Sequence, residues 1–293
     1  MRARGDETVD SQAARVVCIM GMPRSGSSMI ARIMNLMGLY LGPEDGLILE
    51  TEYNVTGCWE HRKLLEISDS ILRKARLYEG EQPDWVQSPA IAGMAETART
   101  VIEADFSDRE LWGWKDERCS LTLPFWDAIL PGRIEGVICI RNPMDVARSI
   151  LKLRWDPSLE AALIRWLIHI SSAIGNTRDR RRLIVFYEDL LGENWETAIR
   201  EVAEFLGPSH VAALPACADE IASFIKKDLR PQSTSLSDLV DDPALPDAVK
   251  HLYLMLHDHV RRRREAGAGV SPGDSERVLE KFASSAYAEA MRL

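Results

Sequence analysis

The sequence predicts an α/β protein with a mostly parallel central sheet flanked by helices on both faces. Short apolar runs of strand length alternate with longer amphipathic segments of helix length along most of the chain. A glycine-bearing turn connects the first apolar run to the first helix, and polar or charged residues follow the other apolar runs. The 293 residues, 46% of them hydrophobic, suffice to bury one large core.

Four apolar runs give the expected strands: residues 16–20, 111–115, 137–141 and 183–187. The expected helices are a first one that begins near Met29 and further ones at residues 64–76, 145–153, 159–174 and 195–206. Ligands of such sheets bind beyond the carboxyl ends of the strands. Since Arg24, Lys115, Arg141 and Tyr187 lie at or just past these ends, we expect them on one rim of the sheet.

Residues 21–28 (GMPRSGSS) form the turn between the first strand and the first helix. Such a turn directs several backbone N–H groups to one place, and the helix N-terminus adds partial positive charge, which together favour a phosphate group. The spacing of Gly21 and Gly26 matches a P-loop, but Ser27 stands where a P-loop has its lysine. The cation of this turn is instead Arg24, so we expect a phosphate ligand other than the β/γ phosphates of ATP.

A second segment, residues 137–149, reads as a strand, a short turn and a helix. Pro143 ends the strand because it has no N–H for the sheet, and Asn142 or Asp145 can cap the helix that follows. Arg141 stands at the strand tip, and Ser149 lies one helical turn beyond Asp145. A guanidinium and a hydroxyl at this spacing suit a phosphate monoester.

Together these segments resemble the bacterial type of sulfotransferase that uses 3′-phosphoadenosine 5′-phosphosulfate (PAPS). The loop at residues 23–28 and the pair Arg141 and Ser149 match the two phosphate-binding motifs of that family. Residues 112–118 (WGWKDER) resemble its Trp-Gly-Trp-Lys-Asp-Pro-Arg stretch, with Glu117 in place of proline. Residues 57–60 (GCWE) and 187–190 (YEDL) resemble two further motifs, and the resemblance covers residues 15–230.

The resemblance implies a P-loop-like sulfotransferase fold and metal-independent, in-line transfer of a sulfuryl group. The donor is PAPS, the product is 3′-phosphoadenosine 5′-phosphate (PAP), and the acceptor is a hydroxyl or amine of a small molecule, lipid or glycan. The implied donor-binding residues are Arg24, Ser25, Gly26, Ser27, Ser28, Arg141, Ser149 and Arg230, with Lys226 as an alternative to Arg230. Arg24 and Lys115 are the implied catalytic cations.

A base must take the proton of the acceptor. Glu60 is the first candidate because it lies in the matching GCWE stretch, and His61 and Asp116 are its rivals. Structural alternatives stay open here, since Lys115 can serve in an ion pair and Glu60 can be a structural carboxylate. The aromatic residues expected to line the acceptor pocket are Trp59, Trp85, Trp155 and Trp166. Trp166 and His169 lie on one helix face and are expected in the core or in the pocket wall.

Along the chain, we expect a disordered lead-in at residues 1–14, a sulfotransferase domain at 15–265, and a linker with a C-terminal helix at 266–293. Residues 233–246, rich in Ser, Asp and Pro, are expected to be a loop or flexible cover. His251, His257, His259 and the arginines at 261–264 are expected on a solvated helix face rather than at a metal or membrane site. The last helix can pack on the body or on a second subunit, so a homodimer stays open.

Composition excludes several function classes. The net charge of −9 disfavours a nonspecific nucleic-acid binder, and no apolar run reaches the length of a membrane span. The five cysteines show no paired spacing, which indicates a reducing compartment, and we expect a cytoplasmic protein. Two other functions remain to be weighed: a P-loop small-molecule kinase, disfavoured by Ser27 and Arg141, and a non-catalytic nucleotide-binding protein.

Overall fold

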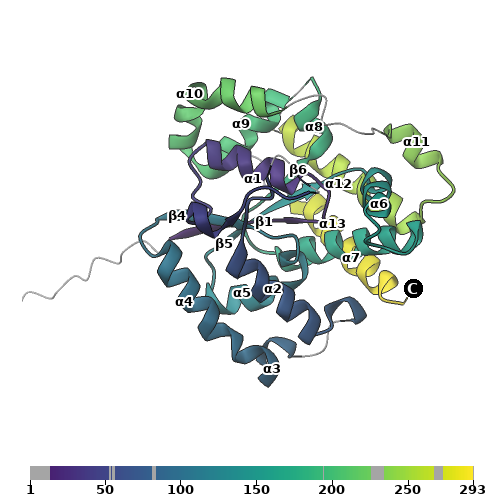
Figure 1. Cartoon of the computed structure of the whole chain (residues 1–293). Coiled ribbons are helices and arrows are strands. Elements are labelled where there is room, and N and C mark those ends of the chain that lie inside the picture. The colour runs from purple at the N-terminus through teal and green to yellow at the C-terminus, as the bar shows by residue number, and fades with distance from the viewer. Residues whose placement is uncertain are drawn as a thin grey trace, which may run out of the picture.

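A computed structural model describes residues 14–52, 54, 57–80, 84–193, 195–225, 234–266 and 273–292 (Figure 1). Its centre is a parallel four-stranded sheet with the order β4-β1-β5-β6. The strands are β1 (Arg15–Gly21), β4 (Leu111–Lys115), β5 (Ile134–Ile140) and β6 (Arg182–Phe186). Helices cover both faces, so the predicted α/β class with a mostly parallel sheet is confirmed.

The connections of the sheet change direction between its two central strands, β1 and β5. The chain leads from β1 to β4 on one side, whereas from β5 it leads to β6 on the other side. The carboxyl ends of β1 and β5 therefore border a topological switch point, where open α/β sheets bind their ligands. The register brings these ends level, with Ile19 opposite Lys115 and Gly21 opposite Cys139.

Alternate side chains of β1 point to opposite faces of the sheet and pack into two hydrophobic cores. Val16, Cys18 and Met20 face one core, and Val17 and Ile19 face the other. The helices of the first face are α2 (Arg62–Lys74), α3 (Pro89–Ala92), α4 (Met94–Phe106), α5 (Cys119–Ile129), α6 (Pro143–Lys152), α7 (Leu159–Asn176), α11 (Leu236–Asp241), α12 (Asp247–Ala266) and α13 (Gly273–Ala290). The helices of the second face are α1 (Ser27–Leu36), α8 (Tyr187–Leu191), α9 (Trp195–Leu206) and α10 (Pro208–Phe224).

Short elements complete the fold. β2 (Leu47–Ile48) and β3 (Glu60–His61) form a two-stranded antiparallel sheet that brings Glu60 next to β4. Single 3-10 turns lie at η1 (Glu44–Gly46), η2 (Leu77–Glu79) and η3 (Trp85–Gln87). None of the helices in the described part of the chain is long and apolar enough to cross a membrane.

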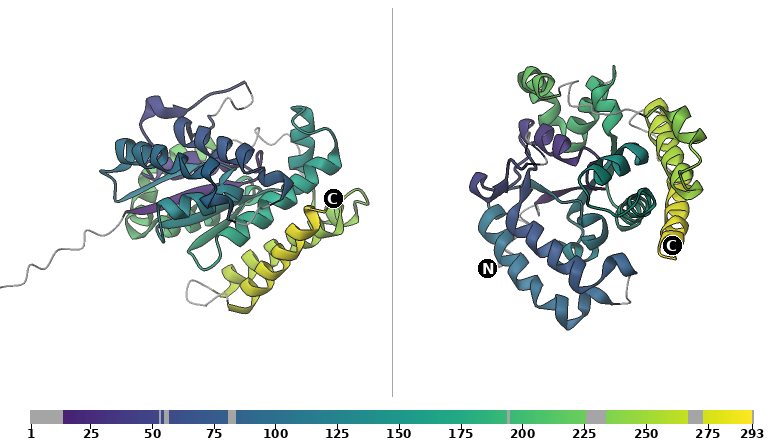
Figure 2. Two further views of the ribbon diagram at one scale, coloured as in Figure 1. Left: turned by 90° about the horizontal axis from the view of Figure 1, so that it is seen from below. Right: turned by 45° about the vertical axis from the view of Figure 1, so that its right-hand side comes forward.

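The C-terminal helices α12 and α13 pack against each other, and α13 packs against α7 (Figure 2). The expected solvated face on α12 is therefore wrong in part. The ring of His257 packs against that of Phe186 with ring centroids 3.9 Å apart, and His259 is buried, while His251 is exposed. Arg264 pairs with Asp189 and Glu201, so the arginine run is only partly solvated. The reason is that α12 is covered by the body of the fold and by α13.

The expected loop at residues 233–246 contains a helix. α11 begins after Ser235, whose hydroxyl accepts a hydrogen bond from the backbone N–H of Asp238 at 3.1 Å. Residues 1–13 of the expected lead-in, residues 267–272 of the expected linker, and both Lys226 and Arg230 lie outside the described residues.

Candidate active site

A cleft of about 470 Å³ opens at the carboxyl ends of the central strands. Every cation that the sequence placed on this rim lines it: Arg24, Lys115 and Arg141, with Tyr187 beside them. Its other lining residues are Pro23, Gly26, Ser27, Ser28, Met29, Ile48, Thr51, Asn54, Cys58, Glu60, Leu65, Glu117, Arg118 and Trp155. The predicted rim is thus one continuous surface in the structure.

The loop after β1 takes a backbone shape that suits an anion. Arg24 has a φ of 73° and Gly26 a φ of 90°, both in the left-handed region that arginine rarely adopts. Alternation of right- and left-handed residues makes a concave nest of backbone N–H groups, and the first N–H groups of α1 have no partner within the helix. A side chain at Gly26 would overlap the ring of Tyr187, so this position needs glycine.

The hydroxyls of the loop differ in where they point. The backbone N–H and the hydroxyl of Ser25 both donate to the carbonyl oxygen of Met22, which closes the turn and leaves Ser25 out of the cleft lining. Ser27 and Ser28 line the cleft. The hydroxyl of Ser27 donates to the Glu117 carboxylate at 2.6 Å.

Two arginines that follow different strands, Arg24 after β1 and Arg141 after β5, meet with Ser149 of α6 at the switch point. Arg24 Nε donates to Ser149 Oγ at 3.1 Å, and Arg141 Nη1 donates to the carbonyl oxygen of Arg24 at 3.2 Å. The Arg141 guanidinium lies 4.6 Å from the ring centroid of Tyr187. Burial and the neighbouring Arg141 lower the pKa of Arg24. Two like charges held together in this way indicate a site for an anion that carries more than one negative charge.

Arg141 is itself buried, with 6% of its surface exposed. Its Nε–H is buried and has no hydrogen-bond partner among the described residues. A buried N–H without a partner costs free energy, which a phosphate oxygen would recover. Asn142 fixes the turn beside it, because its side-chain oxygen caps α6 by accepting from the N–H of Met144 at 2.9 Å.

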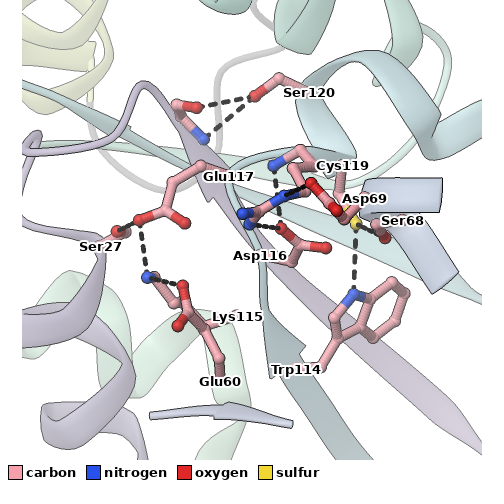
Figure 3. Close-up of polar contacts among 12 residues, drawn as sticks. Ser27, Glu60, Ser68, Asp69, Trp114, Lys115, Asp116, Glu117, Cys119 and Ser120 are labelled. Atoms are coloured by element: carbon pink, nitrogen blue, oxygen red, sulfur yellow. Dashed lines mark hydrogen bonds and ion pairs between the residues drawn. The ribbon is translucent and has the colours of Figure 1, made fainter. Parts of the chain in front are cut away.

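Lys115 lies between two carboxylates (Figure 3). Its Nζ is 2.7 Å from Glu60 Oε1 and 2.6 Å from Glu117 Oε1, and all three side chains are buried or nearly so. Lys115 therefore forms the ion pairs that the sequence analysis gave as its structural alternative. These ion pairs lie in the cleft itself. Because Glu117 also accepts from Ser27, the carboxylate joins the loop to the end of β4.

The two carboxylates differ in proton affinity. Burial raises the pKa of Glu60 to about 7, even though the Lys115 ammonium acts in the opposite direction. Burial also acts to raise the pKa of Glu117, but Lys115 and Ser27 outweigh it and lower that pKa to about 2. Two acids with separated pKa values beside one lysine are typical of a site that moves a proton.

The rivals of Glu60 lie outside the cleft. His61 is buried, contacts Asp105 at 3.1 Å through Nε2, and accepts from the N–H of Leu64 as the cap of α2. Asp116 is fully buried, and its Oδ1 accepts from the backbone and the guanidinium of Arg118 at 3.0 and 3.2 Å. Of the three candidate bases, only Glu60 lines the cleft.

A second cleft of about 580 Å³ adjoins the first. The two share four lining residues: Pro23, Glu117, Arg118 and Trp155. The remaining lining residues of the second cleft are Asp69, Leu72, Arg73, Arg76, Tyr78, Glu79, Arg165 and His169. Of the aromatics expected in a pocket, Trp155 lines both clefts, whereas Trp85 and Trp166 are buried in the core.

Glu117 is the cleft residue to which the sequence analysis assigned no role. The signal was present, because the WGWKDER stretch carries glutamate where the similar family has proline. The position of the Glu117 carboxylate depends on a hydrogen bond from Ser27, which lies 90 residues away in the chain. Arg230, the expected additional phosphate contact, lies outside the described residues.

Comparisons with known proteins give little beyond this geometry. No model of a protein family matches the chain, and no curated protein matches it. Among solved structures, the chain is similar to the sulfotransferase domain of the olefin synthase from Synechococcus PCC 7002. The identity is 16%, the match covers 96% of this chain and 98% of that chain, and the TM-score is 0.41.

Proposed function

We propose that the protein transfers a sulfuryl group from PAPS to a hydroxyl or amine of an acceptor, without a metal. The observation that carries this proposal is the meeting of Arg24, Arg141 and Ser149 beside the loop N–H groups and the N-terminus of α1. In this proposal Arg141 with Ser149 forms one anion site, and the N–H groups of the loop and of the N-terminus of α1 form a second. A nucleotide with phosphates on both its 3′ and 5′ oxygens presents two anions to such a surface.

The donor contacts follow from the placement of these groups. The N–H groups of residues 26–28 and the hydroxyls of Ser27 and Ser28 hold the 5′-phosphosulfate. Arg141 and Ser149 hold the 3′-phosphate, and the unpartnered Nε–H of Arg141 is a donor suited to it. Arg24 lies against Ser149 and helps to neutralise the donor.

The residues of this chain supply position, charge and a base. In the transfer, the bond between sulfur and the bridging phosphate oxygen breaks while sulfur bonds to the acceptor oxygen. Arg24 and Lys115 stabilise the charge that develops on the leaving phosphate. Glu60 takes the proton of the acceptor hydroxyl, and PAP and the sulfated acceptor leave. A carboxylate with a pKa of about 7 is well matched to this task at neutral pH.

A kinase function fits the same cleft less well. Transfer from ATP uses a P-loop lysine on the β/γ phosphates and, on a neighbouring strand, an aspartate for magnesium. Here Ser27 stands in place of that lysine, and Arg141 follows the neighbouring strand β5 in place of that aspartate. Both replacements favour a phosphate monoester over a magnesium-bound triphosphate.

Calorimetric titration of the metal-free protein with PAP tests the proposed donor, with magnesium-ATP titrated in parallel. We expect PAP to bind without added metal and magnesium-ATP to bind far more weakly, because the loop has Ser27 in place of the lysine that holds the β/γ phosphates. Binding of magnesium-ATP alone would point to a kinase. Absence of binding by either nucleotide would contradict both enzyme functions.

Glu117→Gln is expected to tighten PAP binding about tenfold at pH 8, because the substitution removes a negative charge beside the donor site. In the natural chain Glu117 holds Ser27 and Lys115, two groups that the donor needs. For the same reason, PAP affinity of the natural chain should fall as pH rises through about 7, where Glu60 loses its proton. In the variant this pH dependence should move to lower pH, because the charge of Glu117 no longer raises the pKa of Glu60.

Glu110→Gln is the matched control for this prediction. Glu110 is exposed and precedes β4, at the opposite edge of the sheet, and its substitution changes net charge equally. The Glu110→Gln variant should bind PAP with the same affinity as the natural chain. If Glu117→Gln weakens PAP binding, Glu117 supports the donor site instead of competing with the donor.

A further inference from the structure

The second cleft has no role in donor binding as described above. Its volume of about 580 Å³ lies in the range of small-molecule sites. It meets the donor cleft at Glu117, whose carboxylate contacts Lys115 and Ser27. A molecule bound in the second cleft therefore lies against the wall that this cleft shares with the donor cleft.

Two exposed aromatic side chains line this cleft. Tyr78 is 38% exposed and Trp155 43% exposed. The other large hydrophobic residues that are exposed among the described residues are aliphatic: Leu236, Val240 and Val278. Exposed rings placed together in a concave surface typically mark a binding site for a ligand with an apolar face.

A chain of hydrogen bonds fixes the ring of Tyr78 in place. His169 Nδ1 is 3.0 Å from the carbonyl oxygen of Gly21, and because a carbonyl only accepts, Nδ1 carries the proton. His169 Nε2 is then an acceptor for the Tyr78 hydroxyl at 2.8 Å. Burial lowers the pKa of His169 to about 4, so the imidazole stays neutral. The tyrosine is thus anchored to Gly21, the last residue of β1.

A cation completes the support of this ring. The guanidinium of Arg165 lies 5.0 Å from the ring centroid of Tyr78, and Asp156 holds Arg165 at 2.5 Å. An aromatic surface that is rigid before the ligand arrives loses little entropy on binding. The geometry favours stacking against a flat ring over contact with a flexible chain.

The charge of the cleft argues against a highly anionic acceptor. Each arginine that lines it has a carboxylate partner: Arg73 with Asp69, Arg76 with Glu79, Arg118 with Asp116 and Asp69, and Arg165 with Asp156. A polyanionic glycan requires a surplus of unpaired cations along its length. The paired arginines of this cleft do not provide that surplus.

We propose, on the basis of the proposed function, that the second cleft binds the acceptor and that the acceptor is a compact aromatic alcohol. Its ring lies against Tyr78 and Trp155, and its hydroxyl reaches the junction at Glu117. The oxygen of this hydroxyl forms the new bond to sulfur, and its proton passes to Glu60. A phenolic hydroxyl has a pKa of about 10, so it gives up its proton to a carboxylate more readily than an aliphatic alcohol does.

Calorimetry without donor tests the ligand class with a matched pair of alcohols. 2-Naphthol has a flat aromatic skeleton, and decahydro-2-naphthol has the same skeleton without aromaticity. We expect 2-naphthol to bind about tenfold more tightly, because two ring contacts each favour an aromatic partner. Equal affinities of the two alcohols, or no binding of 2-naphthol, would overturn the proposal.

Four variants locate this preference. Tyr78→Leu and Trp155→Leu should each reduce the preference for 2-naphthol from about tenfold to about threefold, because each removes one of the two ring contacts. Tyr78→Phe keeps the ring but loses the bond to His169, so we expect an intermediate loss. Leu236→Ala changes an exposed apolar residue outside the cleft and should bind as the natural chain does. A preference of about tenfold that survives both leucine variants would contradict this site.

Transfer of sulfur-35 from labelled PAPS to 2-naphthol separates this proposal from the donor assignment. Formation of labelled naphthyl sulfate supports both. If 2-naphthol binds with the expected preference but PAP does not bind, the proposed function is wrong and the aromatic site stands without its role as acceptor site. If PAP binds and 2-naphthol neither binds nor is sulfated, only the acceptor proposal is wrong.

Discussion

Arg141→Ala is expected to weaken PAP binding about 100-fold, since a buried guanidinium makes charge-assisted hydrogen bonds that alanine and water do not replace. Arg141 is 6% exposed, lies beside Arg24, and has a buried Nε–H without a partner among the described residues. Calorimetric titration measures the loss. Arg141→Lys keeps the charge but not the fork of donors, so we expect an intermediate affinity.

Adenosine 5′-phosphate provides the selective control for this substitution. It carries the 5′-phosphate of PAP but no 3′-phosphate. The Arg141→Ala variant and the natural chain should bind it with nearly equal affinity. An equal loss for both nucleotides would show that Arg141 acts on the 5′ side or on the loop, and the assignment of the 3′-phosphate would be wrong.

Glu60→Gln is expected to reduce turnover about 10²–10⁴-fold, the usual contribution of a general base. PAP affinity should not weaken, because glutamine adds no charge to the donor site. The measurement compares the rate of transfer to 2-naphthol with PAP affinity by calorimetry. A merely structural carboxylate would instead lower thermal stability and both functions together.

The pH profile gives this prediction a second readout. Burial raises the pKa of Glu60 to about 7, and a base must be deprotonated to act. Turnover of the natural chain should therefore rise with pH through about 7, and this limb should be absent in Glu60→Gln. An unchanged rate in the variant would remove Glu60 as the base and leave Glu117 as the carboxylate that lines both clefts.

The sequence predicted the four central strands because each is a continuous apolar run that is buried on both faces. The same argument could not find β2 and β3, since strands of two residues have no periodicity to detect. The reading of α12 was wrong because its polar residues alone suggested exposure. Their burial depends on β6, which lies far from α12 in the chain, and on the packing of α13 against α12, which the residues of α12 alone do not show.

The part of the site that lies at the strand ends could be predicted from the sequence. Arg24, Lys115 and Arg141 were expected on one rim because parallel strands end together, and all three line the cleft. The contacts of Glu117 and the tether of Tyr78 to Gly21 through His169 were not predictable, because they join residues far apart in sequence. Only tertiary packing shows that Glu60 enters the cleft and that His61 does not.

A crystal structure of the protein with PAP would test the donor site most directly. We expect the 5′-phosphate over the N–H groups of residues 26–28 and the 3′-phosphate in contact with Arg141 Nε and Ser149. Glu117 should then no longer accept from Ser27. PAP bound elsewhere, or bound with Arg141 out of reach of both phosphates, would contradict the proposed function.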